Sequence, residues 1–309
     1  MVSAYCLGYQ NFTVIPHQME EDFKEMVSTG FDTVCLSFSE SEMAYSRRTF
    51  EIQVELAKKC GLNVHVVPSR IGGRFAGAPL MSSLWLEKHP EYMIKTDFRS
   101  IACLEAREFR AWIKEYMKIL LTDYDLSGIV WDEPKGVGVI SHHPETIKKY
   151  GENPTADDMV DSFIDFMEEL SAYCNSLRPG IVQTLFAQPG FDETTTQKIS
   201  KIKHLEYFGY DGAIAKVSFF KETPVLKKKM LKDVWQRTAS ECAEAGKKTF
   251  ALVENMLMPK SELDAFAANF EDYLKSCSPD HLSVYYYAHN NENPEAVHQI
   301  VKRTMKKYL

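Results

Sequence analysis

The chain has 309 residues, of which 45% are hydrophobic, and its net charge is −7 from 36 basic and 43 acidic residues. This acidic balance argues against a protein that binds nucleic acid or another polyanion. Residues 1–6 lack the basic and apolar regions of a signal peptide, and no stretch approaches the ~20 apolar residues of a membrane span. We expect a soluble cytoplasmic protein that does not bind membranes, or a secreted or periplasmic one if a signal peptide has been removed.

Short apolar runs rich in β-branched and aromatic residues recur along the whole chain and alternate with amphipathic, helix-like segments. The predicted strands are residues 4–9, 33–38, 63–68, 128–132, 181–187, 205–210, 249–254 and 282–287. Helical spacing predicts helices over residues 50–59 and 107–121, and Thr155 with Asp158 has the form of a helix capping box. The seven cysteines include no CxxC pair, which favours buried free thiols over disulfides or a zinc site.

Eight strands that alternate with helices predict an α/β protein, a single (β/α)₈ TIM barrel over residues 1–309. A doubly wound open sheet is the alternative, but no GxGxxG turn follows the first strand. A long loop, from residue 69 to about 106, separates the third strand from the third helix of the barrel. Since loops of this length are uncommon in compact domains, we expect it to form one wall of a binding cleft.

The fourth predicted strand ends in Asp132, Glu133 and Pro134. An unpaired charge in an apolar interior costs several kcal/mol, so two adjacent acids after a buried strand indicate that the strand opens into a polar cavity. In a barrel, the carboxyl ends of the strands form the catalytic face. These acids are therefore the first candidates for a carboxylate-based active site.

A second acid, Glu254, ends the seventh predicted strand, across the barrel from Glu133. Two facing carboxylates are what glycoside hydrolysis requires: one protonates the leaving group, and the other is nucleophile or base. We predict Glu133 as general acid and Glu254 as nucleophile or base, with Asp132 tuning Glu133 or sharing its role. Other polar and aromatic residues at strand ends are candidate sugar contacts: Tyr9, Arg70, Trp131, Gln188, Tyr210, Asp211, Asn255, Tyr287, His289 and Asn290.

Other chemistries have less support in the sequence. A metal-dependent lyase or isomerase barrel would need several histidines and acids at strand ends, and only His289 is well placed. There is no GxSxG motif for a serine nucleophile. We therefore predict no metal and no cofactor, with a carbohydrate as the substrate. A barrel that binds carbohydrate without cleaving it is the remaining alternative, because fold does not fix function.

Several of these segments resemble glycoside-hydrolase-like barrel proteins. The stretch from Tyr124 to Pro134 resembles their "Y-D-hydrophobic-D-G-I-x-x-D" strand, residues 108–113 resemble the helix before it, and residues 89–92 are similar to their "HPEW" element. Asp132-Glu133-Pro134 also resembles the Asn-Glu-Pro acid/base motif of retaining clan-A glycosidases, whose nucleophile lies at the position of Glu254. The resemblance implies a glycoside hydrolase that acts on an oligo- or polysaccharide.

Two residues depart from the family pattern. Ser127 stands in place of the aspartate before the glycine, and Asp132 stands in place of the clan-A asparagine. An inverting enzyme, or one in which Asp132 is itself catalytic, fits the sequence equally well. Carboxylates about 5 Å apart would indicate retention, and a separation of roughly 6.5–9.5 Å would indicate inversion.

Overall fold

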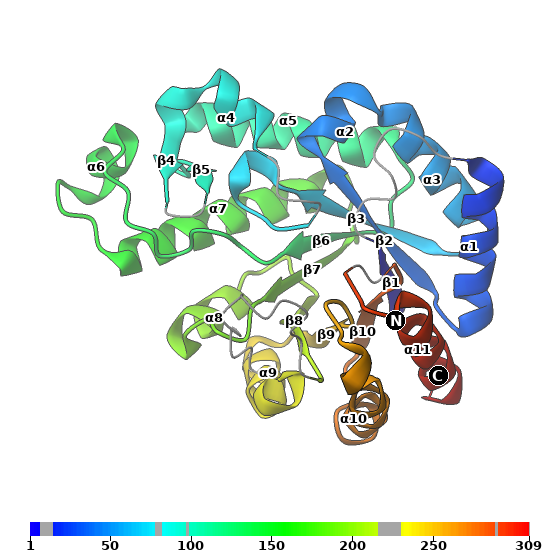
Figure 1. Ribbon diagram of the computed structural model, residues 1–309. Helices are drawn as coiled ribbons and strands as arrows, with labels where there is room; N and C mark the ends of the chain where they lie inside the picture. Colours follow the sequence, from blue (N-terminus) through cyan, green and yellow to red (C-terminus); the bar gives the residue numbers. More distant parts are fainter. Residues whose placement is uncertain (7–14, 78–81, 97–98, 216–229, 288–289, 309) are drawn as a thin grey trace.

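A computed structural model describes the chain except for residues 7–14, 78–81, 97–98, 216–229, 288–289 and 309. In the described residues, eight parallel strands close into a barrel in the order β1-β10-β9-β8-β7-β6-β3-β2 (Figure 1). These strands are β1 Val2–Cys6, β2 Thr33–Ser39, β3 Asn63–Ser69, β6 Gly128–Asp132, β7 Val182–Ala187, β8 Tyr207–Ala213, β9 Lys248–Glu254 and β10 His281–Tyr285. The predicted (β/α)₈ barrel is confirmed. The open sheet is wrong, because β1 pairs with both β10 and β2.

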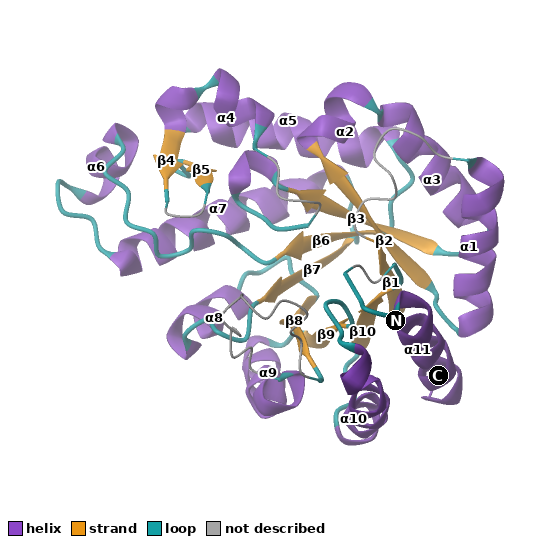
Figure 2. Cartoon of the chain, in the orientation of Figure 1, coloured by secondary structure: helices purple, strands orange, loops and turns teal. Residues whose placement is uncertain are grey.

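The larger helices surround the strands (Figure 2). They are α1 Pro16–Thr29, α3 Arg47–Lys59, α5 Arg107–Asp123, α7 Ala156–Leu177, α8 Glu193–Ser200, α9 Leu231–Ala245, α10 Leu263–Ser276 and α11 Pro294–Tyr308. The capping box that starts α7 is present, with Thr155 and Asp158 bonding each other's backbone N–H. Helix α1 begins at Pro16 and is closed by Gly30 at φ 110°, a conformation that only glycine adopts without strain.

Two apolar layers hold the barrel together. The outer layer lies between strands and helices and includes Phe109, Trp131 and Phe208. The inner layer fills the barrel with the alternate side chains of each strand, among them Tyr5 and Tyr285. Free thiols stand in both layers, as predicted from the cysteine spacing, at Cys35, Cys60, Cys103, Cys174, Cys242 and Cys277.

The segment between β3 and α5 contains short elements of its own, to one side of the barrel (Figure 2). They are the 3₁₀ turns Ile71–Gly73 and Pro90–Tyr92, α4 Leu84–Lys88, and the antiparallel pair β4 Met93–Lys95 and β5 Ser100–Ala102. Two more short helices follow other strands, α2 Glu40–Tyr45 after β2 and α6 Pro144–Tyr150 after β6. Pairing between β3 and β6 covers only His65↔Gly128 and Val66↔Ile129. Further along β6, the N–H of Ala76 bonds the carbonyl of Asp132 instead, at 2.8 Å. The loop thus takes over from β3 as the partner of the end of β6.

Candidate active site

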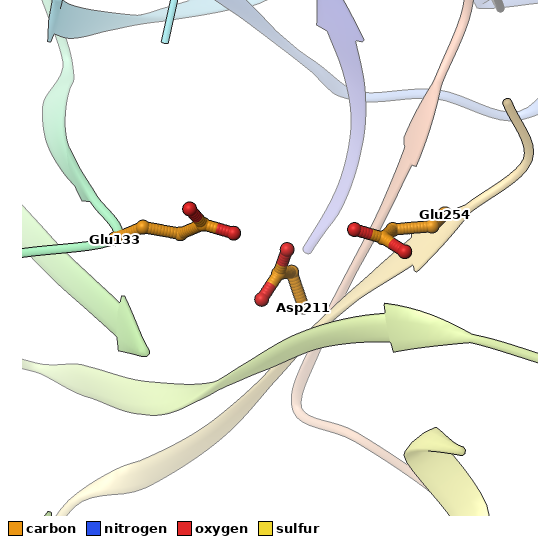
Figure 3. A group of neighbouring side chains, drawn as sticks. All are labelled: Glu133, Asp211 and Glu254. Carbon is orange, nitrogen blue, oxygen red and sulfur yellow. The ribbon is translucent and has the colours of Figure 1, made fainter. Parts of the chain in front are cut away.

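Three carboxylates from different strands meet at the C-terminal mouth of the barrel. Glu133 follows β6, Asp211 lies within β8, and Glu254 is the last residue of β9. Each side chain contributes one carboxylate oxygen, and these three oxygens all lie within 4.8 Å of one another. Figure 3 shows the three side chains pointing toward one another, with Asp211 between the two glutamates. The barrel therefore brings together the predicted pair Glu133 and Glu254, and adds Asp211 to it.

Glu133 reaches this group because the backbone turns sharply after β6. In a regular strand the side chains of Asp132 and Glu133 would point to opposite faces. Glu133 instead has φ 36°, in the left-handed region, and Pro134 follows it. A non-glycine residue in such a conformation costs on the order of 1–3 kcal/mol, and residues of this kind cluster at functional sites. The turn allows both acids to face the mouth of the barrel.

The surroundings of Glu133 favour its ionised form. Lys135 forms an ion pair with its carboxylate, and the Nε2 of Gln188 donates to the same oxygen at 3.0 Å. Burial opposes ionisation, but hydrogen bonding with Asp211 and the charge of Lys135 outweigh it and lower the pKa of Glu133 to about 2. Glu133 is therefore a carboxylate at neutral pH.

Asp132 behaves in the opposite way. Its side chain is 4% exposed and accepts a hydrogen bond from the hydroxyl of Tyr5. Burial, together with the negative charge of Glu133, raises the pKa of Asp132 to about 7. Adjacent carboxyl groups that differ this much in proton affinity are a common arrangement in acid–base catalysis.

Two buried tyrosines lie next to the carboxylates, and neither is among the residues predicted at the strand ends. Tyr5 contacts Asp132, and the ring of Tyr285 packs edge-on against Tyr5 at 5.2 Å. Burial, followed by the charges of Asp132, Asp211, Glu254 and Glu133, raises the pKa of Tyr285 well above its usual value. The signal was available in the period-two alternation of β1 and β10, which places Tyr5 with Ser3 and Tyr285 with Ser283 on the inner face.

Among the predicted sugar contacts, Arg70 and Gln188 lie beside the carboxylates. Arg70 is half-buried, and burial lowers its pKa while the charges of Asp132 and Glu133 act against that shift. Trp131 points to the helix layer, where its Nε1 donates to Gln183 at 3.2 Å. Tyr210 also points outward and donates its hydroxyl hydrogen to Glu241 of α9.

The remaining predicted contacts are spread around the rim. Asn255 is 1% exposed, and its amide bonds both the carbonyl and the N–H of Tyr285. The hydroxyl of Tyr287 donates to Asp22 of α1, and Asn290 is exposed with φ 56°. Tyr9 and His289 lie outside the described residues. For all of these residues, contact with a sugar stays a prediction.

Among the residues that the structure describes, the three carboxylates Glu133, Asp211 and Glu254 also form the cluster whose spacing suits a metal ion. It contains only oxygen donors, which suit Mg²⁺, Ca²⁺ or Mn²⁺ rather than zinc. However, the ammonium group of Lys135 already forms an ion pair with one of the three, Glu133. The same atoms can therefore serve either as acid–base groups or as ligands.

No protein-family model and no curated protein matches the sequence. Solved structures do match in fold. A β-galactosidase from the haloarchaeon Halorubrum lacusprofundi aligns with 100% of this chain at TM-score 0.71 and 10% identity, and one from Marinomonas ef1 with 99% at 0.68 and 10%. The chain spans only 58% and 59% of these two proteins. An endo-1,4-β-mannanase from Rhizomucor miehei aligns over 99% of this chain and 94% of its own, at TM-score 0.62 and 11% identity.

These neighbours are glycoside hydrolases built on a closed parallel barrel, so the chain has the fold of that class of enzymes. At such low identity the likeness is one of fold, and it does not assign a catalytic chemistry to this chain. In the described part of the chain, every helix is too short or too polar to cross a lipid bilayer.

Proposed function

We propose that this protein hydrolyses a glycosidic bond of an oligo- or polysaccharide with retention of configuration. The observation that carries the proposal is the spacing of Glu133 and Glu254, whose nearest oxygens lie within 4.8 Å. Retaining enzymes hold their two carboxyl groups about 5–5.5 Å apart, whereas inverting enzymes need roughly 6.5–9.5 Å to admit a water molecule. The fold neighbours, which include β-galactosidases and a β-mannanase, support the substrate class.

The charge distribution supports a particular division of roles. Glu133, kept ionised by Lys135 and Gln188, suits the nucleophile that attacks the anomeric carbon. This reverses the role predicted for Glu133 from its motif, because a general acid must hold a proton before the reaction. Ionisation of all three carboxyl groups at this spacing would cost free energy through like-charge repulsion, so the cluster of Glu133, Asp211 and Glu254 retains a proton. We assign the general acid, which protonates the oxygen of the leaving sugar, to Asp211 or Glu254.

The second half of the reaction uses the same groups in reverse. The deprotonated acid takes a proton from water, and the resulting hydroxide attacks the anomeric carbon and releases Glu133. Arg70 and Gln188, beside the carboxylates, are our proposed contacts to sugar hydroxyls. Gln188 is exposed at the mouth of the barrel and already contacts Glu133.

The first experiment follows the anomeric proton of the initial product by ¹H NMR on aryl β-galactosides, aryl β-mannosides and oligosaccharides. We expect a product of the same configuration as the substrate. Glu133→Gln should lose at least about 10³-fold in kcat while it keeps its fold. An inverted product would rule out Glu133 as nucleophile. If Glu133→Gln binds and cleaves as the wild type does, the carboxylate assignment is wrong.

Azide separates the roles of the carboxylates. In a nucleophile variant, Glu133→Ala, azide replaces the missing carboxylate and forms a glycosyl azide of inverted configuration. In an acid variant, Asp211→Ala or Glu254→Ala, azide attacks the glycosyl–enzyme intermediate and gives a glycosyl azide of retained configuration. We expect the inverted azide from the Glu133 variant. An inverted azide from the Glu254 variant would restore the roles predicted from the motif.

A further inference from the structure

Arg74 is a buried arginine of the β3–α5 segment that contacts the loop that carries Glu133. Its side chain is 4% exposed. The guanidinium donates to the carbonyl of Ala102 through Nε, at 2.7 Å, and through Nη2. Its Nη1 lies 3.4 Å and 3.3 Å from the carbonyls of Lys135 and Gly136. Among the described residues, no carboxylate lies within ion-pair distance of it.

A buried cation without a counter-ion costs several kcal/mol unless its donors are satisfied. Burial lowers the pKa of Arg74 to about 10. Because this value is still well above 7, the guanidinium remains charged at neutral pH. Its rigid fork can serve several carbonyls at once, which a lysine ammonium cannot do in the same geometry. The carbonyls to which it donates belong to β5 and to the loop that carries Glu133, so the side chain connects these two segments.

The backbone around Arg74 holds the same loop from both sides of Glu133. The carbonyl of Arg74 accepts from the N–H of Lys135 at 2.8 Å, and the N–H of Ala76 donates to the carbonyl of Asp132 at 2.8 Å. Gly136 permits this approach: a Cβ there would lie 2.2 Å from Cδ1 of Ile101 and 3.2 Å from Nη1 of Arg74.

A second buried charge in this region shows what Arg74 does differently. Glu40 is 6% exposed and accepts from the N–H groups of Gly72 and Trp85 and from the hydroxyl of Ser83. All three donors belong to the β3–α5 segment, so Glu40 anchors that segment to α2. Arg74, by contrast, reaches across to the residues that follow Glu133.

We propose that Arg74 is a positioning residue for Glu133. Its guanidinium fixes the backbone of Lys135 and Gly136, which holds the left-handed turn at Glu133 and keeps the ammonium of Lys135 against the carboxylate. The consequence for turnover rests on the proposed function, but the consequence for the ionisation of Glu133 does not. The two can therefore be tested separately.

The test is Arg74→Lys, which keeps the buried charge but loses the fork. Arg178 provides the matched control, because its guanidinium also donates to three carbonyls, those of Leu121, Tyr124 and Leu126, at the opposite end of β6. The first measurement is the titration of Glu133, by NMR with carboxyl-¹³C glutamate, assigned from Glu133→Gln. The second is kcat and KM on the best glycoside, and the third is the thermal midpoint.

We expect Arg74→Lys to raise the pKa of Glu133 by at least about one unit, since Lys135 is released from its position. We expect kcat to fall roughly 10- to 100-fold, the usual effect of misplacing a catalytic group by about 1 Å, with little change in KM. Arg178→Lys should lower the thermal midpoint and leave the other two readouts unchanged. The proposal is overturned if Arg74→Lys behaves like Arg178→Lys.

Gly136→Ala tests the same contact from the side of the loop and replaces Arg74→Lys if that variant does not fold. It should shift the Glu133 titration in the same direction, and an unshifted titration overturns the proposal. If the wild type cleaves no glycoside but the titration shifts as expected, the positioning role stands and the proposed function fails.

Discussion

Both ends of the barrel interior bury polar groups, but the protonation of these groups differs between the two ends. At the N-terminal end, His65 and His281 are 1% and 0% exposed, with their rings 6.1 Å apart. Burial lowers the pKa of His65 to about 4 and the pKa of His281 well below its usual value. Both rings are therefore neutral, and His281 bonds the hydroxyl of Ser3 at 3.0 Å.

At the C-terminal end, burial also penalises charge, yet charge persists there. Lys135 and Gln188 keep Glu133 ionised, while burial and the charge of Glu133 raise the pKa of Asp132 to about 7. The difference lies in the loops, which can supply cations and donors where the strands open. At the closed, N-terminal end, the described neighbours of the His281 ring include the hydroxyl of Ser3 and the aromatic rings of Tyr207 and Phe250. Burial alone thus gives neutral, inert groups, and burial with nearby counter-charges gives groups suited to catalysis.

The largest expected effect comes from removing a carboxylate at the open end. Glu254→Gln should reduce kcat/KM by about 10³-fold or more, because Glu254 belongs to the carboxyl pair on which the proposed hydrolysis rests. Ser283→Ala, at the closed end, should change kcat/KM by less than about threefold. Comparable losses from both variants would contradict the contrast between the ends. Circular dichroism of each variant checks that its fold is kept.

A pH-dependent loss of stability is expected at the closed end. Unfolding lets His65 bind a proton at pH 6.5, whereas the folded protein resists protonation down to about pH 4. Stability should therefore fall as the pH drops through this window, by at most about 3 kcal/mol from this residue. His65→Leu should remove that part of the slope in urea unfolding at pH 7 and pH 4.5. The control variant is His17→Gln, which removes an exposed histidine.

A smaller effect is expected from Lys135→Met. Loss of the ammonium raises the pKa of Glu133 from about 2 toward its usual value, so the acid limb of kcat/KM should move up by about one pH unit. Stability should fall more at pH 7 than at pH 2, since the lowered pKa stabilises the fold only while Glu133 is ionised. Lys58→Met, which removes an exposed ion pair with Asp125, is the control and should not move the limb.

The smallest effect is expected from chelation. Incubation with EDTA followed by gel filtration should change kcat/KM by less than about twofold, because Lys135 already serves one of the three carboxylates. Elemental analysis of the purified protein accompanies the assay. A stoichiometric Mg²⁺, Ca²⁺ or Mn²⁺, with activity lost on its removal, would favour the metal-dependent lyase or isomerase over the hydrolase.

Strand β6 shows how much of the site the sequence predicts. Its bounds, residues 128–132, were predicted correctly because an apolar run followed by acids and a proline has one physical reading. Asp211 was expected just after a strand that ends at residue 210, but β8 continues to Ala213 and places Asp211 among the carboxylates. Trp131 and Tyr210 were expected at the mouth and point into the helix layer instead, because neighbouring residues on a strand face opposite sides.

The sequence by itself determined the (β/α)₈ barrel, its eight strands in order, and the strand ends that carry acids, because these depend on local periodicity and composition. Tertiary structure decided which of those acids meet. The contact of Tyr5 with Asp132 and the contacts of Arg74 with residues 135 and 136 join parts of the chain far apart in sequence, and the latter hold the loop that contains the turn at Glu133. Their physical basis is the closure of the barrel, which no local pattern specifies.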